Sequence, residues 1–230
     1  MKIAAVIFDM DGLMLDTEPL YRHAWQQAAI ECGRTVSDAL YSRLIGLRTE
    51  DAERILRAEF GPDFQFDAYR ATYLRWEKKI FSAAPPPKKP GLDELLAFLE
   101  SRQIPKAVAT STYRELAEPR LVSTGLLPRF SALVTGDEAA NGKPAPDLFL
   151  LAARRLRAEP SACLVLEDAE PGVLAARAAS MQVYFVPDMN PPTAKVKELA
   201  AAIFDSLFAV AGHLEASPIS LAEPGPRRIS

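Results

Sequence analysis

The chain of 230 residues is poor in the residue types that build disulfide frameworks and histidine-rich metal sites. It has two cysteines and two histidines. Cys32 and Cys163 fall in segments that we expect to be buried, which predicts reduced core thiols, and His23 and His213 are isolated, so we assign them no chemistry. No apolar run approaches the length that crosses a bilayer, and no signal-peptide pattern precedes the first predicted strand. These features predict a cytoplasmic protein without a membrane partner.

An excess of positive charge is also absent. The 27 Lys and Arg residues are outnumbered by 30 Asp and Glu residues, which gives a formal net charge of −3. We therefore expect no general attraction to polyanions and no nucleic-acid partner. Hydrophobic residues make up 49% of the chain and charged residues 25%, a composition typical of globular proteins with a substantial core. A monomer is the default expectation.

The N-terminal segment predicts a short buried strand that ends in two acids. Ala4–Phe8 is an uninterrupted apolar run, as in parallel strands that are covered on both faces. Asp9, Asp11 and Gly12 follow it directly. Because carboxylates are costly to bury, we expect them where the strand emerges, at the carboxyl edge where open α/β sheets bind ligands. From this segment alone, an ordinary polar turn is an equal alternative.

Residues 17–86 are predicted to form an inserted unit of four helices without a strand. Apolar residues recur at helical spacing in four segments, which are Thr17 (as N-cap) to Cys32, Ser37 to Ile45, Glu50 to Phe60 and Phe66 to Ile80. We expect the aromatic stripe of the last helix to be core and assign it no ligand role. The proline-rich segment Pro85–Pro90 is a stiff, extended linker. Together with Leu15–Thr17 it is expected to form the hinge of this unit.

The remainder of the chain predicts an α/β fold. Apolar runs that read as strands alternate with helical segments; the runs are 106–109, 132–134, 163–166 and 183–186, and the helices are 92–102, 113–123, 147–156 and 172–179. Pro119 is expected to shorten or kink the second of these helices. We predict a doubly wound, Rossmann-like, mainly parallel sheet formed by residues 1–16 and 87–214. A marginal strand at 203–204 precedes a last helix through Leu214, and residues 215–230 are expected to be disordered.

Polar side chains follow every central strand of this predicted sheet. They are Asp9 and Asp11 after the first strand, Thr110, Ser111 and Thr112 after the second, Lys143 in the loop after the third, and Glu167 and Asp168 after the fourth. Parallel strands bring these ends to one edge of the sheet. Clustered carboxylates repel each other unless a cation is present, and oxygen ligands of this kind suit Mg²⁺. The additional lysine and hydroxyls suit a phosphoryl group, so the pattern predicts phosphoryl transfer.

These segments resemble the four motifs of the haloacid dehalogenase-like hydrolase superfamily. The matching residues are Asp9-Met10-Asp11-Gly12-Leu13, a Thr or Ser after the second strand, Lys143-Pro144, and Glu167-Asp168 followed by Pro171-Gly172-Val173. The helical insert resembles the small cap of the branch that contains β-phosphoglucomutase and small sugar-phosphate phosphatases. The resemblance covers residues 1–214.

The resemblance implies a role for each acid. Asp9 would be the nucleophile that forms an aspartyl-phosphate, and Asp11 would protonate the leaving oxygen and then accept a proton from the hydrolytic water. Mg²⁺ would be held by Asp9, the backbone carbonyl of Asp11 and Asp168, with Glu167 as a ligand or in the second shell.

The resemblance also implies how the phosphate and the rest of the substrate are held. Ser111, with Thr110 as the alternative, would bind phosphate oxygens, and Lys143 would offset the charge between nucleophile and phosphate. Thr112 is a further candidate for substrate binding. Arg48 lies in a loop that resembles the family's substrate-specificity loop and would contact the distal part of the substrate.

The reaction itself is narrowed but not fixed by these residues. Asp11 argues against a dehalogenase, because dehalogenases of this family lack that acid. In the mutase, the first cap helix carries a histidine where this chain has Tyr21, and the cap arginine aligns with Thr49. We therefore expect a phosphatase that acts on a small phosphomonoester, either a sugar phosphate or a nucleoside or pseudouridine monophosphate. A β-phosphoglucomutase-type mutase is the alternative, and a non-catalytic phosphometabolite-binding protein is less favoured.

Overall fold

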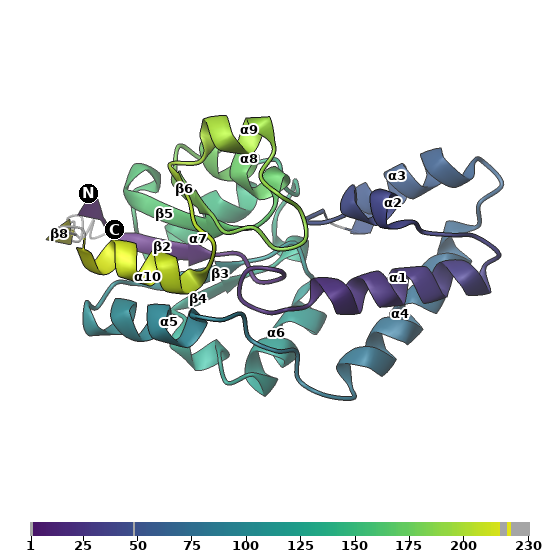
Figure 1. Ribbon diagram of the computed structural model, residues 1–230, viewed down its shortest axis with the longest axis horizontal. Coiled ribbons are helices and arrows are strands. Elements are labelled where there is room, and N and C mark those ends of the chain that lie inside the picture. The colour runs from purple at the N-terminus through teal and green to yellow at the C-terminus, as the bar shows by residue number, and fades with distance from the viewer. Residues whose placement is uncertain (1, 48, 217–219, 222–230) are drawn as a thin grey trace, which may run out of the picture.

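The computed structural model describes residues 2–47, 49–216 and 220–221. It contains a parallel sheet with helices on both faces and a separate group of four helices (Figure 1). The sheet has the strand order β4-β3-β2-β5-β6-β7, and each of its pairings is parallel. Its strands are β2 (Ala5–Phe8), β3 (Lys106–Ala109), β4 (Ala132–Val134), β5 (Cys163–Glu167), β6 (Gln182–Phe185) and β7 (Ala202–Ile203). The predicted doubly wound α/β fold is therefore confirmed.

The central strand β2 is buried on both faces, and its alternate residues belong to two separate cores. Val6 and Phe8 lie in the core on one face, whereas Ala5 and Ile7 lie in the core on the other. The first core is covered by α5 (Leu92–Ser101), α6 (Arg114–Ser123) and α10 (Leu207–Ala216). The second core is covered by α7 (Asp147–Leu156), α8 (Glu170–Ala178) and α9 (Ala194–Leu199). Short 3₁₀ turns η1 (Leu127–Arg129), η2 (Gly136–Glu138) and η3 (Pro160–Ala162) complete this sheet part.

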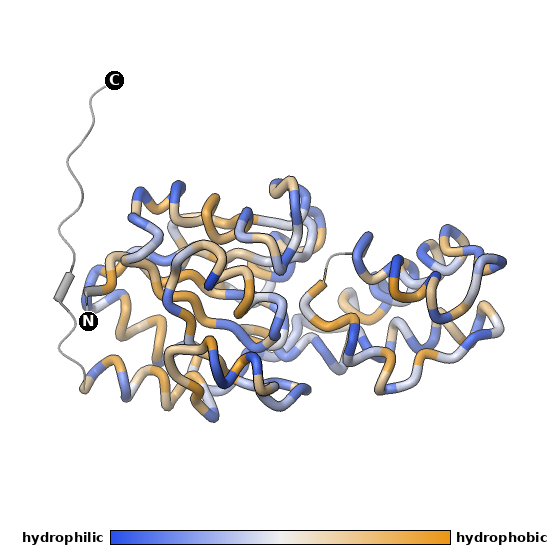
Figure 2. Tube along the Cα trace, turned by 90° about the horizontal axis from the view of Figure 1, so that it is seen from above, coloured by the Kyte–Doolittle hydropathy of each residue, from blue (hydrophilic) through white to orange (hydrophobic). Residues whose placement is uncertain are grey.

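The four helices after β2 form a unit with a core of its own. They are α1 (Glu18–Glu31), α2 (Asp38–Ser42), α3 (Thr49–Phe60) and α4 (Phe66–Phe81), and α1 lies alongside α4. Trp25 stacks on Tyr73 and Tyr69 at ring-centroid distances of 4.6 and 5.7 Å, which places the predicted aromatic stripe in this core. Figure 2 shows hydrophobic segments inside both parts of the molecule. We refer to residues 18–81 as the helical unit.

Two chain segments connect the helical unit to the sheet part, and they run side by side. Leu15 and Lys88 form an isolated antiparallel bridge. The Asp16 N–H donates to the carbonyl of Pro87 at 2.8 Å, and the Lys89 N–H donates to the carbonyl of Met14 at 2.9 Å. The two predicted hinge segments are therefore joined by backbone hydrogen bonds.

Several local predictions need correction. The helix expected to reach Ile45 ends at Ser42. Leu44 and Ile45 lie in the turn that follows, and they are apolar because the turn buries them, not because they continue the helix. Pro119 does not shorten α6, since the buried residues Arg120 and Leu121 anchor its last turn. The helix α9 was not predicted, and Cys32 is only half-buried although Cys163 is buried.

The C-terminal segment is partly ordered, contrary to expectation. Glu215 and Ala216 belong to α10. Further on, β8 (Ser220–Leu221) forms a parallel strand pair with the backbone of β1 (Lys2–Ile3). Residues 217–219 and 222–230 lie outside the described residues. Among the helices that the structure describes, none has both the length and the apolar character needed to cross a membrane.

The contact between α5 and α10 provides a test of the sheet part. Gly91 has φ +87°, and a Cβ there would lie 2.2 Å from the backbone nitrogen of Phe208, whereas Gly125 has φ +71° and open space around it. We expect Gly125→Ala to lower the free energy of unfolding by about 1 kcal/mol through backbone strain alone. Gly91→Ala should lower it by about 3 kcal/mol or more, because the α10 backbone must also move. Urea unfolding followed by circular dichroism measures both, and equal losses would contradict this packing.

Candidate active site

The carboxyl ends of three neighbouring strands bring the predicted site residues together. Asp9 follows β2, Thr110 follows β3 on one side, and Glu167 ends β5 on the other side. The strand order reverses at β2, and ligands bind at this kind of reversal in open α/β sheets. A cavity of about 130 Å³ opens there between the sheet part and the helical unit. Its polar lining includes Asp9, Asp11, Glu18, Tyr21, Tyr41, Arg70, Tyr73, Glu77, Thr110, Ser111 and Thr112.

A buried lysine joins two carboxylates at the centre of the site. Lys143, which is 2% exposed, donates from Nζ to Oδ1 of Asp9 and to Oε1 of Glu167, the latter at 2.6 Å. The other carboxylate oxygen of Glu167 accepts the N–H groups of Asp168 and Ala169 at 2.9 and 3.0 Å. Glu167 is thus engaged by the protein on both oxygens.

Burial and charge act in opposite directions at this lysine and its partner. Burial raises the pKa of Asp9 above its ordinary value, while the ammonium of Lys143 opposes this shift. Burial alone would lower the pKa of Lys143, but the carboxylates of Asp9 and Glu167 outweigh it and raise that pKa. Lys143 is therefore a fixed positive charge in direct contact with the proposed nucleophile.

The second acid, Asp11, is held by threonine hydroxyls. Thr17 Oγ1 donates to Oδ1 of Asp11 at 2.8 Å, and Thr112 Oγ1 donates to Oδ2 at 2.7 Å. Thr110 Oγ1 lies 3.4 Å from the same Oδ2 atom. Thr17 was predicted to cap α1 with its side chain, but that hydroxyl makes no cap bond and binds Asp11 instead. Thr112 lines the cavity, yet its hydroxyl is committed to Asp11.

Ser111 contacts the helical unit. Its Oγ, predicted to bind phosphate, lines the cavity and donates to the backbone carbonyl of Gly46 at 3.1 Å. Gly46 has φ +78°, and a Cβ there would lie 2.9 Å from the Cβ of Ala169, so the loop after α2 lies close against the sheet part. Arg48, the candidate for a distal substrate contact in this loop, lies outside the described residues.

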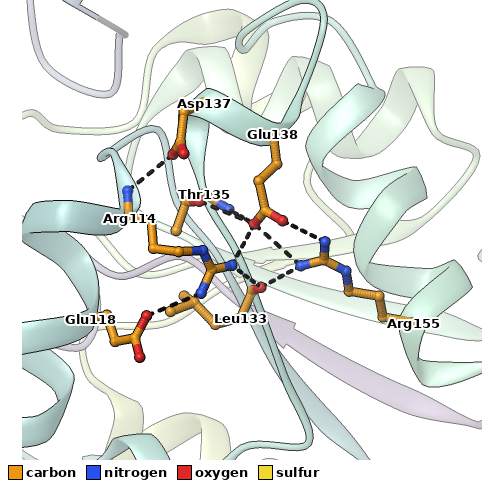
Figure 3. Close-up of polar contacts among 7 residues, drawn as sticks. All are labelled: Arg114, Glu118, Leu133, Thr135, Asp137, Glu138 and Arg155. Carbon is orange, nitrogen blue, oxygen red and sulfur yellow. Dashed lines mark hydrogen bonds and ion pairs between the residues drawn. The ribbon is translucent and has the colours of Figure 1, made fainter.

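A charged cluster fixes the backbone that carries Ser111 and Thr112 (Figure 3). Glu138 binds the guanidinium groups of Arg114, at 2.6 Å, and Arg155, which tie α6 and α7 to η2. Asp137 accepts the N–H of Arg114 at 3.0 Å and so holds the start of α6. The N–H of Gly136, the first residue of η2, donates to the carbonyl of Thr112 at 3.1 Å. The loop after β3 is therefore held in place by η2 and by the start of α6.

The carboxylates next to Asp9 suit a divalent cation. Burial raises the pKa of Asp168 well above its ordinary value, and repulsion from Glu167 and Asp9 adds to the shift. A cation between Asp9 and Asp168 would remove this cost without protonation. Among the described residues, no three Asp, Glu, His or Cys side chains could hold a metal by themselves. The third protein donor would then be the backbone carbonyl of Asp11, as the resemblance implies.

The space beside these carboxylates supports the same ligand set. A Cβ at Gly12 would lie 2.3 Å from Oδ2 of Asp168 and 3.2 Å from Oδ2 of Asp188, so glycine leaves room for both carboxylates at the turn after β2. The Oδ2 atom of Asp188 is buried and has no hydrogen-bond partner in the described part of the chain. A metal-bound water is a group that such an unpaired oxygen could accept from. The residues present therefore fit a hydrated divalent cation held by Asp9 and Asp168.

Sequence reasoning missed the acids that the helical unit contributes. Glu18 is 5% exposed and accepts the hydroxyl of Tyr41 at 2.5 Å, and Glu77 is 2% exposed and pairs with Arg120. Glu77 follows Tyr73 by four residues, so it lies on the apolar stripe that predicted core. An acid on such a stripe was the signal that could have identified a buried, paired carboxylate.

The comparisons with known proteins agree with the site. The family model for haloacid dehalogenase-like hydrolases matches residues 3–180. The chain therefore belongs to this hydrolase family, as its four motifs predicted.

Relatives across the family share most of the chain's length. A phosphorylated carbohydrates phosphatase of Thermotoga maritima is 35% identical over 77% of this chain and 82% of its own length. A probable pseudouridine-5'-phosphatase of Drosophila melanogaster is 36% identical over 81% of this chain and 83% of its own length. A β-phosphoglucomutase structure from Clostridium difficile has a TM-score of 0.78 over 90% of this chain and 92% of its own, and at 24% identity it shows the shared fold.

The buried carboxyl of Glu18 makes stability depend on pH. Burial raises the pKa of Glu18 from 4.5 to about 8, so the folded state binds more protons than the unfolded chain between these values. Stability should therefore fall as the pH rises from about 4.5 to about 8. We expect Glu18→Gln, which can still accept from Tyr41, to gain about 4 kcal/mol at pH 9 relative to its effect at pH 5.

Thermal or urea unfolding of the wild type and the Glu18→Gln variant at the two pH values tests this expectation. Glu94→Gln, an exposed change on α5, is the matched control and should show no such pH difference. The same effect at both pH values would show that Glu18 is not buried as a costly charge.

Proposed function

We propose that the protein is a phosphatase that hydrolyses a small phosphomonoester. The observation that carries this proposal is the buried Asp9, which contacts the Lys143 ammonium at the edge of a cavity enclosed by the helical unit. The phosphatase names of relatives that are 35 and 36% identical support the same reaction. A cavity of about 130 Å³ suits a small ester better than a segment of a folded phosphoprotein. A sugar phosphate or a nucleoside monophosphate is the substrate class that we infer.

The reaction assigns separate roles to the residues of the site. An oxygen of Asp9 attacks phosphorus and forms an aspartyl-phosphate, while Lys143 balances the negative charge of nucleophile and phosphate. Asp11 gives a proton to the leaving oxygen and accepts one from the water that cleaves the intermediate. The hydroxyl of Ser111 moves from the carbonyl of Gly46 to a phosphate oxygen when substrate binds. Asp168 completes the site as a metal ligand.

Two further proposals concern the helical unit and the metal. The helical unit acts as a cap that opens on the paired segments at Leu15 and Lys88 to admit substrate and closes to exclude water. Asp9, Asp168 and the carbonyl of Asp11 would hold Mg²⁺, which when bound supplies positive charge to the phosphoryl oxygens.

The environment of Tyr21 favours the phosphatase over the mutase. Tyr21 occupies the cap-helix position at which the mutase carries a histidine. Loss of solvent around its hydroxyl raises the pKa of Tyr21 well above its ordinary value, so this side chain exchanges no proton near neutral pH. A histidine at this position could exchange one, as the mutase alternative would require.

Removal of the nucleophile tests the assignment of Asp9. Phosphate release is measured with Mg²⁺ from a panel of sugar phosphates and nucleoside and pseudouridine monophosphates. We expect Asp9→Asn to lower kcat by more than about a thousandfold, because an amide cannot form the aspartyl-phosphate. The matched control is Asp67→Asn, at an exposed position in the first turn of α4, which should keep full activity. Near-normal turnover in Asp9→Asn would reject the nucleophile.

If the wild type releases no phosphate from the panel, the same protein should be tested for isomerisation of β-glucose 1-phosphate. Turnover in that assay would replace the phosphatase by the mutase. Inactivity in both assays would favour a binding protein.

Metal removal gives an independent test of the site. Chelation by EDTA should abolish phosphate release, because it leaves the buried carboxylates of Asp9 and Asp168 without a compensating positive charge. Added Mg²⁺ should restore phosphate release, because it supplies that charge. Asp168→Asn should raise the Mg²⁺ concentration needed for half-maximal activity by at least about tenfold. Activity that survives chelation would reject the metal requirement.

A further inference from the structure

A buried ion pair joins the helical unit to the sheet part outside the four sequence motifs. Arg120 of α6 and Glu77 of α4 lie 2.8 Å apart, between NH2 and Oε1, and their side chains are 5% and 3% exposed. The guanidinium also lies over the rings of Phe81, at 3.9 Å from the centroid, and Tyr21, at 5.0 Å. Either charge alone would be costly at this depth, so each requires the other. Glu77 therefore fixes Arg120 in one position.

A second nitrogen of the same guanidinium begins a chain of hydroxyl contacts. Arg120 donates from NH1 to the Oη atom of Tyr21, and arginine has no acceptor. Tyr21 Oη lies 3.4 Å from Oγ1 of Thr112, whose hydroxyl donates to Asp11 Oδ2. The same NH1 atom of Arg120 also lies 4.0 Å from Oδ1 of Asp11, so the guanidinium forms a longer, direct ion pair with this carboxylate.

The direction of every bond in this chain follows from the number of protons. Each hydroxyl has one hydrogen to give. The hydrogen of Thr112 is given to Asp11, so Thr112 accepts from Tyr21, and Tyr21 in turn accepts from Arg120. The chain therefore runs from Arg120 to the carboxylate of Asp11, and it cannot reverse because arginine cannot accept.

We propose that Arg120 is a positioning residue that holds the carboxylate of Asp11 as an oriented hydrogen-bond acceptor, through the hydroxyls of Tyr21 and Thr112 and through its own ion pair with Asp11. This inference rests on the proposed phosphatase reaction. Because Tyr21 and Glu77 belong to the helical unit, the chain is complete only when that unit lies against α6. Asp11 is thus oriented by contacts that close with the cap.

The step that depends on this orientation is the breakdown of the aspartyl-phosphate. The oxygen of a water molecule attacks phosphorus, and the bond between phosphorus and the Asp9 oxygen breaks with its electron pair returning to the Asp9 carboxylate. The proton of the water passes to the carboxylate of Asp11. Formation of the aspartyl-phosphate from 4-nitrophenyl phosphate needs no proton, because nitrophenolate leaves as an anion. Loss of the chain should therefore slow breakdown and spare formation from this substrate.

The variant Tyr21→Phe tests the proposal, since it removes one oxygen and keeps the ring beneath Arg120. Rapid-quench kinetics with 4-nitrophenyl phosphate and Mg²⁺ separate formation of the phosphoenzyme from its breakdown. We expect breakdown to slow about tenfold and formation to change less than about twofold, so that kcat and KM fall together. Arg120→Lys, which keeps the charge but lacks the planar fork, should act in the same direction.

Matched controls and opposite outcomes make the test decisive. Tyr184→Phe in β6 and Arg129→Lys in η1 make the same chemical changes away from the cavity and should leave both steps unchanged. If Tyr21→Phe leaves breakdown unchanged, or slows both steps equally, the hydroxyl chain is rejected, and if Arg120→Lys does the same, the role of Arg120 is rejected while the phosphatase stands. If the wild type forms no phosphoenzyme from any substrate of the panel, the proposed function falls and this inference falls with it.

Discussion

The site depends on one buried ammonium that is shared between two carboxylates. Lys143 contacts Asp9 at the end of β2 and Glu167 at the end of β5, and both side chains are nearly inaccessible to solvent. Loss of the lysine would leave two buried carboxylates without their counter-charge. Glu167 also binds the backbone after β5, so the same contact orients Asp168. A single cation thus links the ends of two neighbouring strands, and with them the proposed nucleophile and the backbone that carries a proposed metal ligand.

Sequence reasoning could predict the site residues that are charged although they stand next to a strongly apolar segment. Acids directly after a fully apolar run, as at Asp9, predict a strand end at a ligand site without any knowledge of distant contacts. Lys143 could be placed in the site because it stands in the loop after the third predicted strand, whose end meets the same edge of the sheet. The strands themselves were predicted well, since a strand buried on both faces has a continuous apolar sequence.

Other residues were beyond a local argument. Arg120 and Glu77 are 43 positions apart, and periodicity indicates only which face of a helix is buried, not which charge meets it across another element. The hydroxyls after β3 show the same limit. Spacing placed Thr110, Ser111 and Thr112 at the sheet edge but did not give their separate partners. The bonds of Thr110 and Thr112 to Asp11 depend on the turn after β2, and the bond of Ser111 to the Gly46 carbonyl depends on how the helical unit lies against the sheet.

The place of β2 in the sheet has a consequence for how the chain folds. This strand is synthesised before both of its neighbours, which begin at Lys106 and Cys163, so the middle of the sheet cannot form until both of these segments have left the ribosome. Closing such long loops costs conformational entropy before the strand pairs can stabilise the sheet, and this slows the assembly of the sheet. Meanwhile the apolar faces of β2 and its backbone edges stay uncovered, whereas the helices between residues 18 and 81 have a core of their own. Until Cys163–Glu167 is available, β2 therefore lacks one of its two neighbours, while residues 18–81 can already pack on one another.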